Sequence, residues 1–181
     1  PAQRTAARRW HWHECFVLTV ERLLPSDFSN AERWDAFVMA CPQATFFHRS
    51  GWQSIIGDVF RHDTYFLYAR DGDTIAGVLP LAHVNSRLFG NALVGLPFAV
   101  YGGVAASSSE AAQALELQAQ AIAQRLKVDH LELRNVDRRH DDWPTQELYV
   151  TFRKEILAQE DANMLAIPRK QRAMVRKGIK N

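Results

Sequence analysis

A tyrosine that precedes two consecutive glycines is the best candidate for a binding residue in this chain. Tyr101 ends an apolar run and is followed by Gly102 and Gly103. Backbone without side chains can approach a ligand closely, and a phenol beside it can form a hydrogen bond. A tyrosine packed in the core would fit the same pattern. Both interpretations stay open for Tyr101.

Charged residues further along the chain offer a second candidate. Arg134 ends an expected strand over His130–Arg134, and an arginine at a strand end is a good ligand for a carboxylate or a phosphate. The alternative is that Glu132 and Arg134 pair with neighbouring charges. The polar loop Asp137–Asp142 also carries carboxylates and a histidine, but we expect it to be a solvated surface loop.

The basic end of the chain is a third candidate. We expect a helix after Pro168, with all its cations within a little under half of its circumference. One face would dock on protein, and the other would be free for phosphates, with Arg172 and Arg176 as ligands. A solvated basic face is the alternative, and RNA binding has thin support without stacking aromatic residues. The apolar face is expected to hold Met174, Val175 and Ile179.

Familiar catalytic and cofactor motifs are absent from the sequence. There is no G-x-S-x-G elbow, no G-x-x-x-x-G-K loop and no G-x-G-x-x-G loop. Gly102 and Gly103 precede a helix, but Val104–Ser108 intervene and no basic residue accompanies them. We therefore expect no acyl-CoA site in this part of the protein and assign no catalytic residue.

Metal binding is not expected either. His11 and His13 would share one face of a strand, but no third ligand is evident, and the two cysteines have no metal-ligand spacing. His48 and His83 are expected to be structural. Cys15 and Cys41 are expected to be buried free thiols in a reducing compartment, and no secretory signal is found, which favours the cytoplasm.

Composition and charge limit the possible partners. The 181 residues are 47% hydrophobic and 23% charged, which is ordinary for a globular domain. Both ends are basic and the middle is acidic, unlike a general DNA-binding surface. No charged residue lies between Arg87 and Glu110, but Pro97 and several glycines argue for buried strands rather than a membrane span.

Periodicity predicts the elements of a mixed α/β domain with one central sheet. We expect strands over Cys15–Leu23, Thr64–Ala69, Thr74–Val84, Arg87–Gly95, His130–Arg134 and Glu147–Arg153. Asp71-Gly72-Asp73 is expected to form a hairpin turn. Helices are expected after a Ser29/Glu32 capping box, over Ser50–Phe60, and after a Ser107/Glu110 capping box. Residues expected to face the core are Trp34, Phe37, Val38, Trp52, Ile55, Ile56, Val59, Ala111, Leu115, Ala119, Ile122 and Leu126.

The order of short motifs resembles the FemAB family, and within it the proteins of bacterial exopolysaccharide and PEP-CTERM gene clusters. The resemblance covers roughly Asp27 to Asn181. It includes Trp52, Pro80, the turn L-P-F-x-x-Y-G-G at 96–103, Leu131–Arg134 and the run R-K-x-R-x-M-V-R-K-G at 169–178. It implies a GNAT-like fold, that is, one resembling acyl-CoA N-acyltransferases, with a single central mixed sheet flanked by helices.

The resemblance also implies a domain organisation. Residues 1–14 would be a basic flexible extension, and 15–160 would be the first of two GNAT-like domains. Residues 161–181 would be a basic helix that introduces the second domain, so this part alone would be inactive. A reading frame that continues past Asn181 would favour the enzyme, and a stop codon there would favour a binding module.

The function implied is an acyl- or aminoacyl-transferase that forms an amide on an amine of a cell-wall or exopolysaccharide precursor. The donor in the whole protein would be acyl-CoA or aminoacyl-tRNA, and the acceptor an anionic glycan or nucleotide-sugar precursor. Tyr101 would border the groove between the domains, and the segment leading to Trp52 would flank the acceptor pocket.

Family members that bind a muropeptide carry a lysine soon after that tryptophan, and Ile55-Ile56-Gly57 lies here instead. This difference favours another acceptor, such as an amino sugar. The alternative function is a non-catalytic module that binds a glycan precursor or a partner protein.

Overall fold

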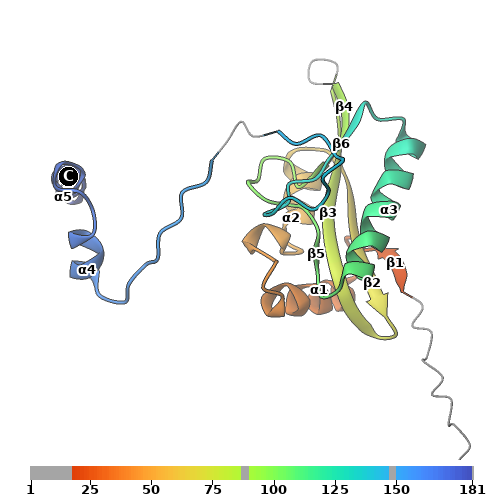
Figure 1. Cartoon of the computed structure of the whole chain (residues 1–181), viewed down its shortest axis with the longest axis horizontal. Coiled ribbons are helices and arrows are strands. Elements are labelled where there is room, and N and C mark those ends of the chain that lie inside the picture. The colour runs from red at the N-terminus through yellow and green to blue at the C-terminus, as the bar shows by residue number, and fades with distance from the viewer. Residues whose placement is uncertain (1–17, 87–89, 147–149, 181) are drawn as a thin grey trace, which may run out of the picture. The chain divides into compact units, whose positions relative to one another are not determined.

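The structure is a computed structural model that describes residues 18–86, 90–146 and 150–180 (Figure 1). The chain divides into two compact units, Pro1–Asp141 and Asp142–Asn181. The first unit holds the sheet and most of the helices, whereas the second holds two short helices. Each unit is described by itself below. The domain boundaries expected at residues 14 and 160 stay predictions.

The first unit is built on a six-stranded mixed sheet. Its order is β1-β2-β3-β4-β6, and β5 also pairs with β3. All neighbours are antiparallel except β4 and β6, which are parallel. The mixed α/β class with one central sheet is therefore confirmed. The strands are β1 (Thr19–Arg22), β2 (Asp63–Asp71), β3 (Thr74–Ser86), β4 (Gly90–Gly95), β5 (Ala105–Ala106) and β6 (His130–Glu132).

Alternating side chains place a core on each face of the sheet. In β2, Phe66 and Tyr68 belong to one buried cluster, while Leu67 and Ala69 belong to the other. This follows from the two-residue period of a strand. Helix α1 (Phe28–Ala40) covers the first face and α3 (Ser109–Leu126) covers the second, as Figure 1 shows. The sheet is thus flanked by helices, as predicted.

The predicted hairpin and helices are present, but both predicted capping boxes are wrong. The side chain of Asp27, not Ser29, caps α1 by accepting from the backbone N–H of Asn30 at 3.1 Å. Ser108 caps α3. Ser107 instead donates both its N–H and its hydroxyl to the Ala76 carbonyl of β3.

The second predicted helix differs from an ordinary α-helix. One turn, α2 (Trp52–Ser54), continues into a π-helix, η2 (Ile55–Val59). The wider turn changes which residues face the core. Gln53 and Ile56 are buried, but Ile55 and Val59 are exposed, contrary to the prediction.

The predicted core stripe of α3 is confirmed. Ala111, Leu115, Ala119 and Ile122 are buried at helical spacing, and Leu126 packs partly buried against the same cluster. Lys127 ends the helix with a left-handed φ of 51°. The chain then returns to the sheet as β6.

The second unit contains α4 (Glu160–Leu165) and α5 (Arg169–Ile179). Helix α5 begins after Pro168 as predicted, whereas α4 was not predicted. The strand predicted over Glu147–Arg153 is wrong for 150–153, which have no strand partner, and 147–149 lie outside the described residues. Within the described ranges, no helix is long and apolar enough to cross a membrane.

We expect a buried carboxylate on the α3 stripe to destabilise the first unit. Leu115→Asp or Ile122→Asp should lower the free energy of unfolding by about 3 kcal/mol or more, because the wild-type side chains are at most 2% exposed. Urea denaturation measures the change. The control is Leu117→Asp on the same helix, where the side chain is 57% exposed and the change should stay within about 0.5 kcal/mol. Equal effects at the three positions would show that the stripe is misplaced.

Candidate binding site at the end of β4

The segment between β4 and β5, 96–104, leaves the sheet in the middle of β3. Gly95 lies opposite Leu81, and Ala105 lies opposite Val78 on the same side of β3. The backbone N–H of Leu96 makes one further bond, to the Pro80 carbonyl at 2.9 Å. The N–H and C=O of one strand residue point to the same edge of the strand. The Pro80 carbonyl faces the end of β4, so an N–H at this position would also face β4 and not β2. The proline therefore removes no hydrogen bond to β2.

Beyond the end of β4, the glycine pair of this loop lies next to the chain that follows β6. Gly102 and Gly103 both donate their backbone N–H to the Arg134 carbonyl, at 3.1 and 3.0 Å. The N–H of Val104 donates to the Asn135 side chain at 2.9 Å. A Cβ on Gly102 would lie 2.5 Å from the Leu96 Cβ and 2.6 Å from the Gly95 carbonyl oxygen. Only glycine fits this packing.

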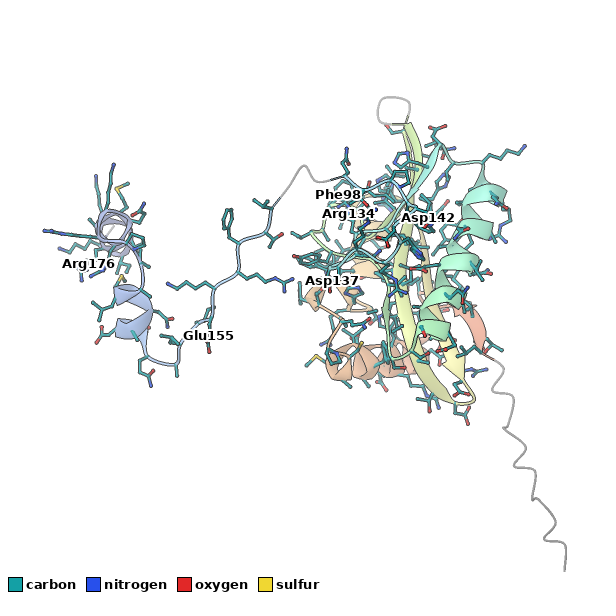
Figure 2. The ribbon with its side chains drawn as sticks, viewed as in Figure 1. Phe98, Arg134, Asp137, Asp142, Glu155 and Arg176 are labelled. Carbon is teal, nitrogen blue, oxygen red and sulfur yellow. The ribbon has the colours of Figure 1, made fainter. Side chains whose placement is uncertain are left out.

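The side chain of Arg134 fastens the other end of the loop. Its guanidinium donates to the Ala99 carbonyl at 2.6 Å and to Oε1 of Glu132 at 2.7 Å. The pairing with a neighbouring charge is thus present, and the Arg134 side chain is 29% exposed. A role in binding a ligand stays a prediction. Figure 2 labels Arg134 and also Phe98, which precedes Ala99.

His48 holds the loop through a hydrogen bond to Gly103. It is 1% exposed, and its Nε2 lies 3.1 Å from the Gly103 carbonyl. Because the Thr45 N–H donates to its Nδ1 at 3.0 Å, the ring proton is on Nε2, which donates to Gly103. Burial lowers the pKa of His48 below its ordinary value of 6.5. His48 is therefore a neutral structural residue, as its sequence context suggested.

The two predicted aromatic site residues, Tyr101 and Trp52, are both half-buried. Tyr101 is half-buried within the loop itself. Trp52 is half-buried against the core cluster that includes Ala99, and its indole N–H donates to the Phe46 carbonyl at 3.3 Å. The loop thus lies next to Arg134 and shares a core cluster with Trp52. No observation assigns a ligand to these residues.

Three rings form an exposed cluster that the sequence analysis did not single out. Phe98 stacks on Phe60 with ring centroids 4.2 Å apart and 18° between the planes. The His62 ring lies 5.9 Å from Phe98 at 13°. We call Phe60, His62 and Phe98 the ring cluster. Phe98 is 60% exposed and Phe60 40% exposed, so the cluster presents aromatic surface to solvent.

Backbone conformation holds three residues of this region in uncommon geometry. Phe98 has a φ of 68°, Leu96 of the same loop a φ of 42°, and Arg61, between Phe60 and His62, a φ of 59°. Positive φ is uncommon outside glycine, asparagine and aspartate. The signal available in the sequence was the F of L-P-F-x-x-Y-G-G, but nothing in the sequence indicates its φ or its partner Phe60.

The polar loop Asp137–Asp142 is a mostly exposed surface loop, as expected, but two of its residues also contact a helix. Arg139 and His140 both contact Glu116 of α3, at 2.7 and 2.9 Å. Glu116 is only 3% exposed. A carboxylate so deeply buried requires partners, and the loop supplies them. This contact fixes the chain that leaves Arg134.

The remaining predicted ligands, Arg172 and Arg176, lie in the second unit. The Arg172 guanidinium donates to the carbonyls of Leu165 and Ile167, so it holds the turn between α4 and α5. Arg176 is exposed. On the apolar face of α5, Met174, Val175 and Ile179 are 69%, 39% and 72% exposed, and the docking of this face on protein stays a prediction.

Two further observations bear on metal binding and on binding of an acyl donor. Among the described residues, no group of three or more histidine, cysteine, aspartate or glutamate side chains could hold a metal ion, and His11 and His13 lie outside them. The N–H groups of Gly102 and Gly103 are already bonded to Arg134. They cannot also bind the phosphates of an acyl donor, so this turn is suited to positioning side chains.

Comparisons with known proteins give a structural likeness but no match in sequence. No protein-family model and no curated protein matches the sequence. A GNAT family acetyltransferase of Staphylococcus aureus subsp. aureus USA300_TCH1516 is similar in structure, with a TM-score of 0.46 and 12% sequence identity. The similarity covers 78% of this chain and 98% of the acetyltransferase.

We expect Gly102→Ala to destabilise the first unit by about 2 kcal/mol or more, because the added Cβ would overlap Leu96 and Gly95. Thermal or urea unfolding measures the loss. The matched control is Gly57→Ala, since an added Cβ there meets nothing within 4 Å and alanine favours a helix. A Gly102→Ala protein as stable as the Gly57→Ala protein would contradict the close packing.

We also expect His48 to make the stability depend on pH. Its folded pKa lies below 6.5, so the unfolded chain binds the proton more readily. The contribution is full above about pH 6.5 and is lost as the pH falls toward the folded pKa. His48→Gln keeps a donor for Gly103 but does not titrate. The parent should lose more free energy of unfolding than this variant between about pH 8 and about pH 5.5, and parallel curves would refute the role of His48.

Proposed function

We propose that this chain supplies the acceptor-binding part of a FemAB-like acyl- or aminoacyl-transferase, which forms an amide on an amine of a cell-wall or exopolysaccharide precursor. The motif order described above supports the family. The geometry of the L-P-F-x-x-Y-G-G turn is the single observation that carries the assignment to acceptor binding. This turn is rigidly held on Arg134 and His48, and it presents Tyr101 and Phe98 on a fixed backbone.

The reaction needs an amine to attack an activated carbonyl, and its catalyst must position both groups. The loop is suited to the first task, because a braced backbone costs little further ordering when a ligand binds. The donor, acyl-CoA or aminoacyl-tRNA, would be bound by a second GNAT-like domain of the whole protein. The bonded Gly102 and Gly103 amides support this division, since they leave no phosphate site at the turn.

The basic face of α5 would contact the anionic part of the precursor or of an aminoacyl-tRNA. The helix carries Arg169, Lys170, Arg172, Arg176 and Lys177, with Lys180 at its C-cap, and contains no acidic residue. Arg176 is the better ligand of the two arginines singled out, because Arg172 already bonds two backbone carbonyls.

A non-catalytic module is the second candidate. The same observation on the glycine amides favours it, because the described part of the chain then binds an acceptor or a partner protein without a donor. The two functions differ in what the whole protein does with a bound acceptor, and not in the binding itself.

We expect the 181-residue protein to bind an amino sugar and to form no amide. Titration calorimetry with UDP-glucosamine should show binding, whereas acetyl-CoA should not bind and neither acetyl-CoA nor charged tRNA should support turnover. Tyr101→Phe should weaken acceptor binding by about fivefold, which corresponds to one hydrogen bond. Tyr65→Phe on β2 is the control and should bind like the parent.

Robust turnover by the 181 residues would overturn the division between acceptor and donor parts. Absence of any amino-sugar binding would overturn the acceptor assignment itself.

A further inference from the structure

We propose that the ring cluster, Phe60, His62 and Phe98, is a stacking site for the pyranose ring of an amino sugar. The proposal rests on the proposed function and names the chemical class of its acceptor. It also places the sugar ring on residues for which the sequence analysis assigned no role.

The rings offer more aromatic surface than their own stacking buries. Phe98 and Phe60 stack at 4.2 Å, yet they remain 60% and 40% exposed. Val59, next to Phe60, is 68% exposed. A pyranose ring has an apolar face of C–H groups that can pack on aromatic faces, while its hydroxyl groups remain in water. The exposed stack is a suitable surface for such a face.

Each half of the stack is held by unusual backbone. Phe60 follows the π-helix Ile55–Val59, and π-turns often lie at functional positions. Arg61 and Phe98 both have positive φ. Such outliers persist only where surrounding structure fixes them. Two separate segments therefore use uncommon backbone to bring one ring against the other.

The loop that carries Phe98 is pinned on both sides of that residue. Leu96 donates to the Pro80 carbonyl, and the Ala99 carbonyl accepts from Arg134. The Phe98 ring thus has a fixed position before any ligand binds. Pre-organisation of this kind lowers the entropic cost of binding.

The local charge favours an amine over a phosphate. The sequence between Arg87 and Glu110, which includes Phe98, carries no charge. Two exposed carboxylates, Asp58 and Asp63, and one exposed arginine, Arg61, flank Phe60 in the sequence, and the Arg134 side chain that bonds the Ala99 carbonyl is paired with Glu132. Aromatic faces attract cations, and carboxylates pair with them. A sugar whose amine is protonated complements this surface better than a neutral or a phosphorylated sugar does.

The experiment uses the full chain and two oligosaccharides of equal length. The probes are a β-1,4-linked glucosamine tetramer and its fully N-acetylated counterpart. Titration calorimetry gives the affinity, and saturation-transfer NMR shows which ring protons of the sugar contact the protein. We expect the glucosamine tetramer to bind more tightly, with saturation transferred to the C–H protons of one ring face.

Variants locate the site. Phe98→Gly removes the ring and relieves the positive φ, so folding should survive, which a thermal melt checks. It should weaken binding of the glucosamine tetramer by about fivefold or more, and Phe60→Ala should do the same. Phe98→Tyr keeps the ring and should bind like the parent. Phe28→Ala, which removes a ring that is 77% exposed at the start of α1, is the control and should change nothing.

The outcomes separate this proposal from the proposed function. If the tetramer binds and Phe98→Gly binds it equally well, the stacking site is wrong while acceptor binding stands. If only the acetylated tetramer binds, and does so through Phe98, the amino-sugar class is wrong. If neither tetramer binds but UDP-glucosamine does, the stacking site is again wrong, and the acceptor assignment survives.

Discussion

One backbone carbonyl, that of Arg134, organises the region around the candidate site. It accepts hydrogen bonds from the amides of both Gly102 and Gly103, so the chain returning from β4 lies against the end of β6. This approach is possible only without side chains, since a Cβ at Gly102 would overlap Leu96 and Gly95. The positions of Tyr101, Ala99 and Phe98 follow from that contact, and the Arg134 side chain adds a second tie to the same loop.

The sheet makes room for this loop because β3 is longer than either of the strands on its second edge. This strand of 13 residues pairs with β2 from Thr74 to His83, whereas its other edge is shared by β4 and β5. The loop occupies the gap between the two short strands. Pro80 lies where β4 ends, so the absence of its N–H interrupts no pairing with β2. Sequence features that usually break a strand are thus confined to the edge where the sheet is already interrupted.

Much of the fold could be predicted from periodicity, because burial decides it. The stripe Ala111 to Ile122 and the hairpin at Gly72 follow from the spacing of apolar residues and from the turn composition. The helix caps could not be predicted as well, because Asp27 and Ser108 compete with equally suitable neighbours and tertiary bonds such as Ser107 to Ala76 decide between them. The strand expected through 150–153 failed for a related reason, since alternating residues form a strand only where a partner is available.

The candidate site was only partly predictable. Tyr101, Trp52 and Arg134 were singled out from residue type and position, and the structure places the loop of Tyr101 against Arg134 and in a shared core cluster with Trp52. Their roles stay predictions. Phe60 and Phe98 are 38 positions apart, and their pairing depends on two positive φ values and a π-turn, none of which leaves a periodic pattern. The sequence likewise did not indicate the contact of Glu116 with Arg139 and His140. A glutamate on a helix looks the same in sequence whether it is buried or exposed.

The π-helix has a consequence for how this surface could change in evolution. A π-turn holds one residue more than an α-turn and takes it up by widening, so the chain on either side keeps nearly its direction. A helix with one residue fewer within Ile55–Val59 could therefore return to the ordinary α form with Phe60 still directed at Phe98. The aromatic surface can thus tolerate a change of helix length, and selection on it acts on the two rings themselves.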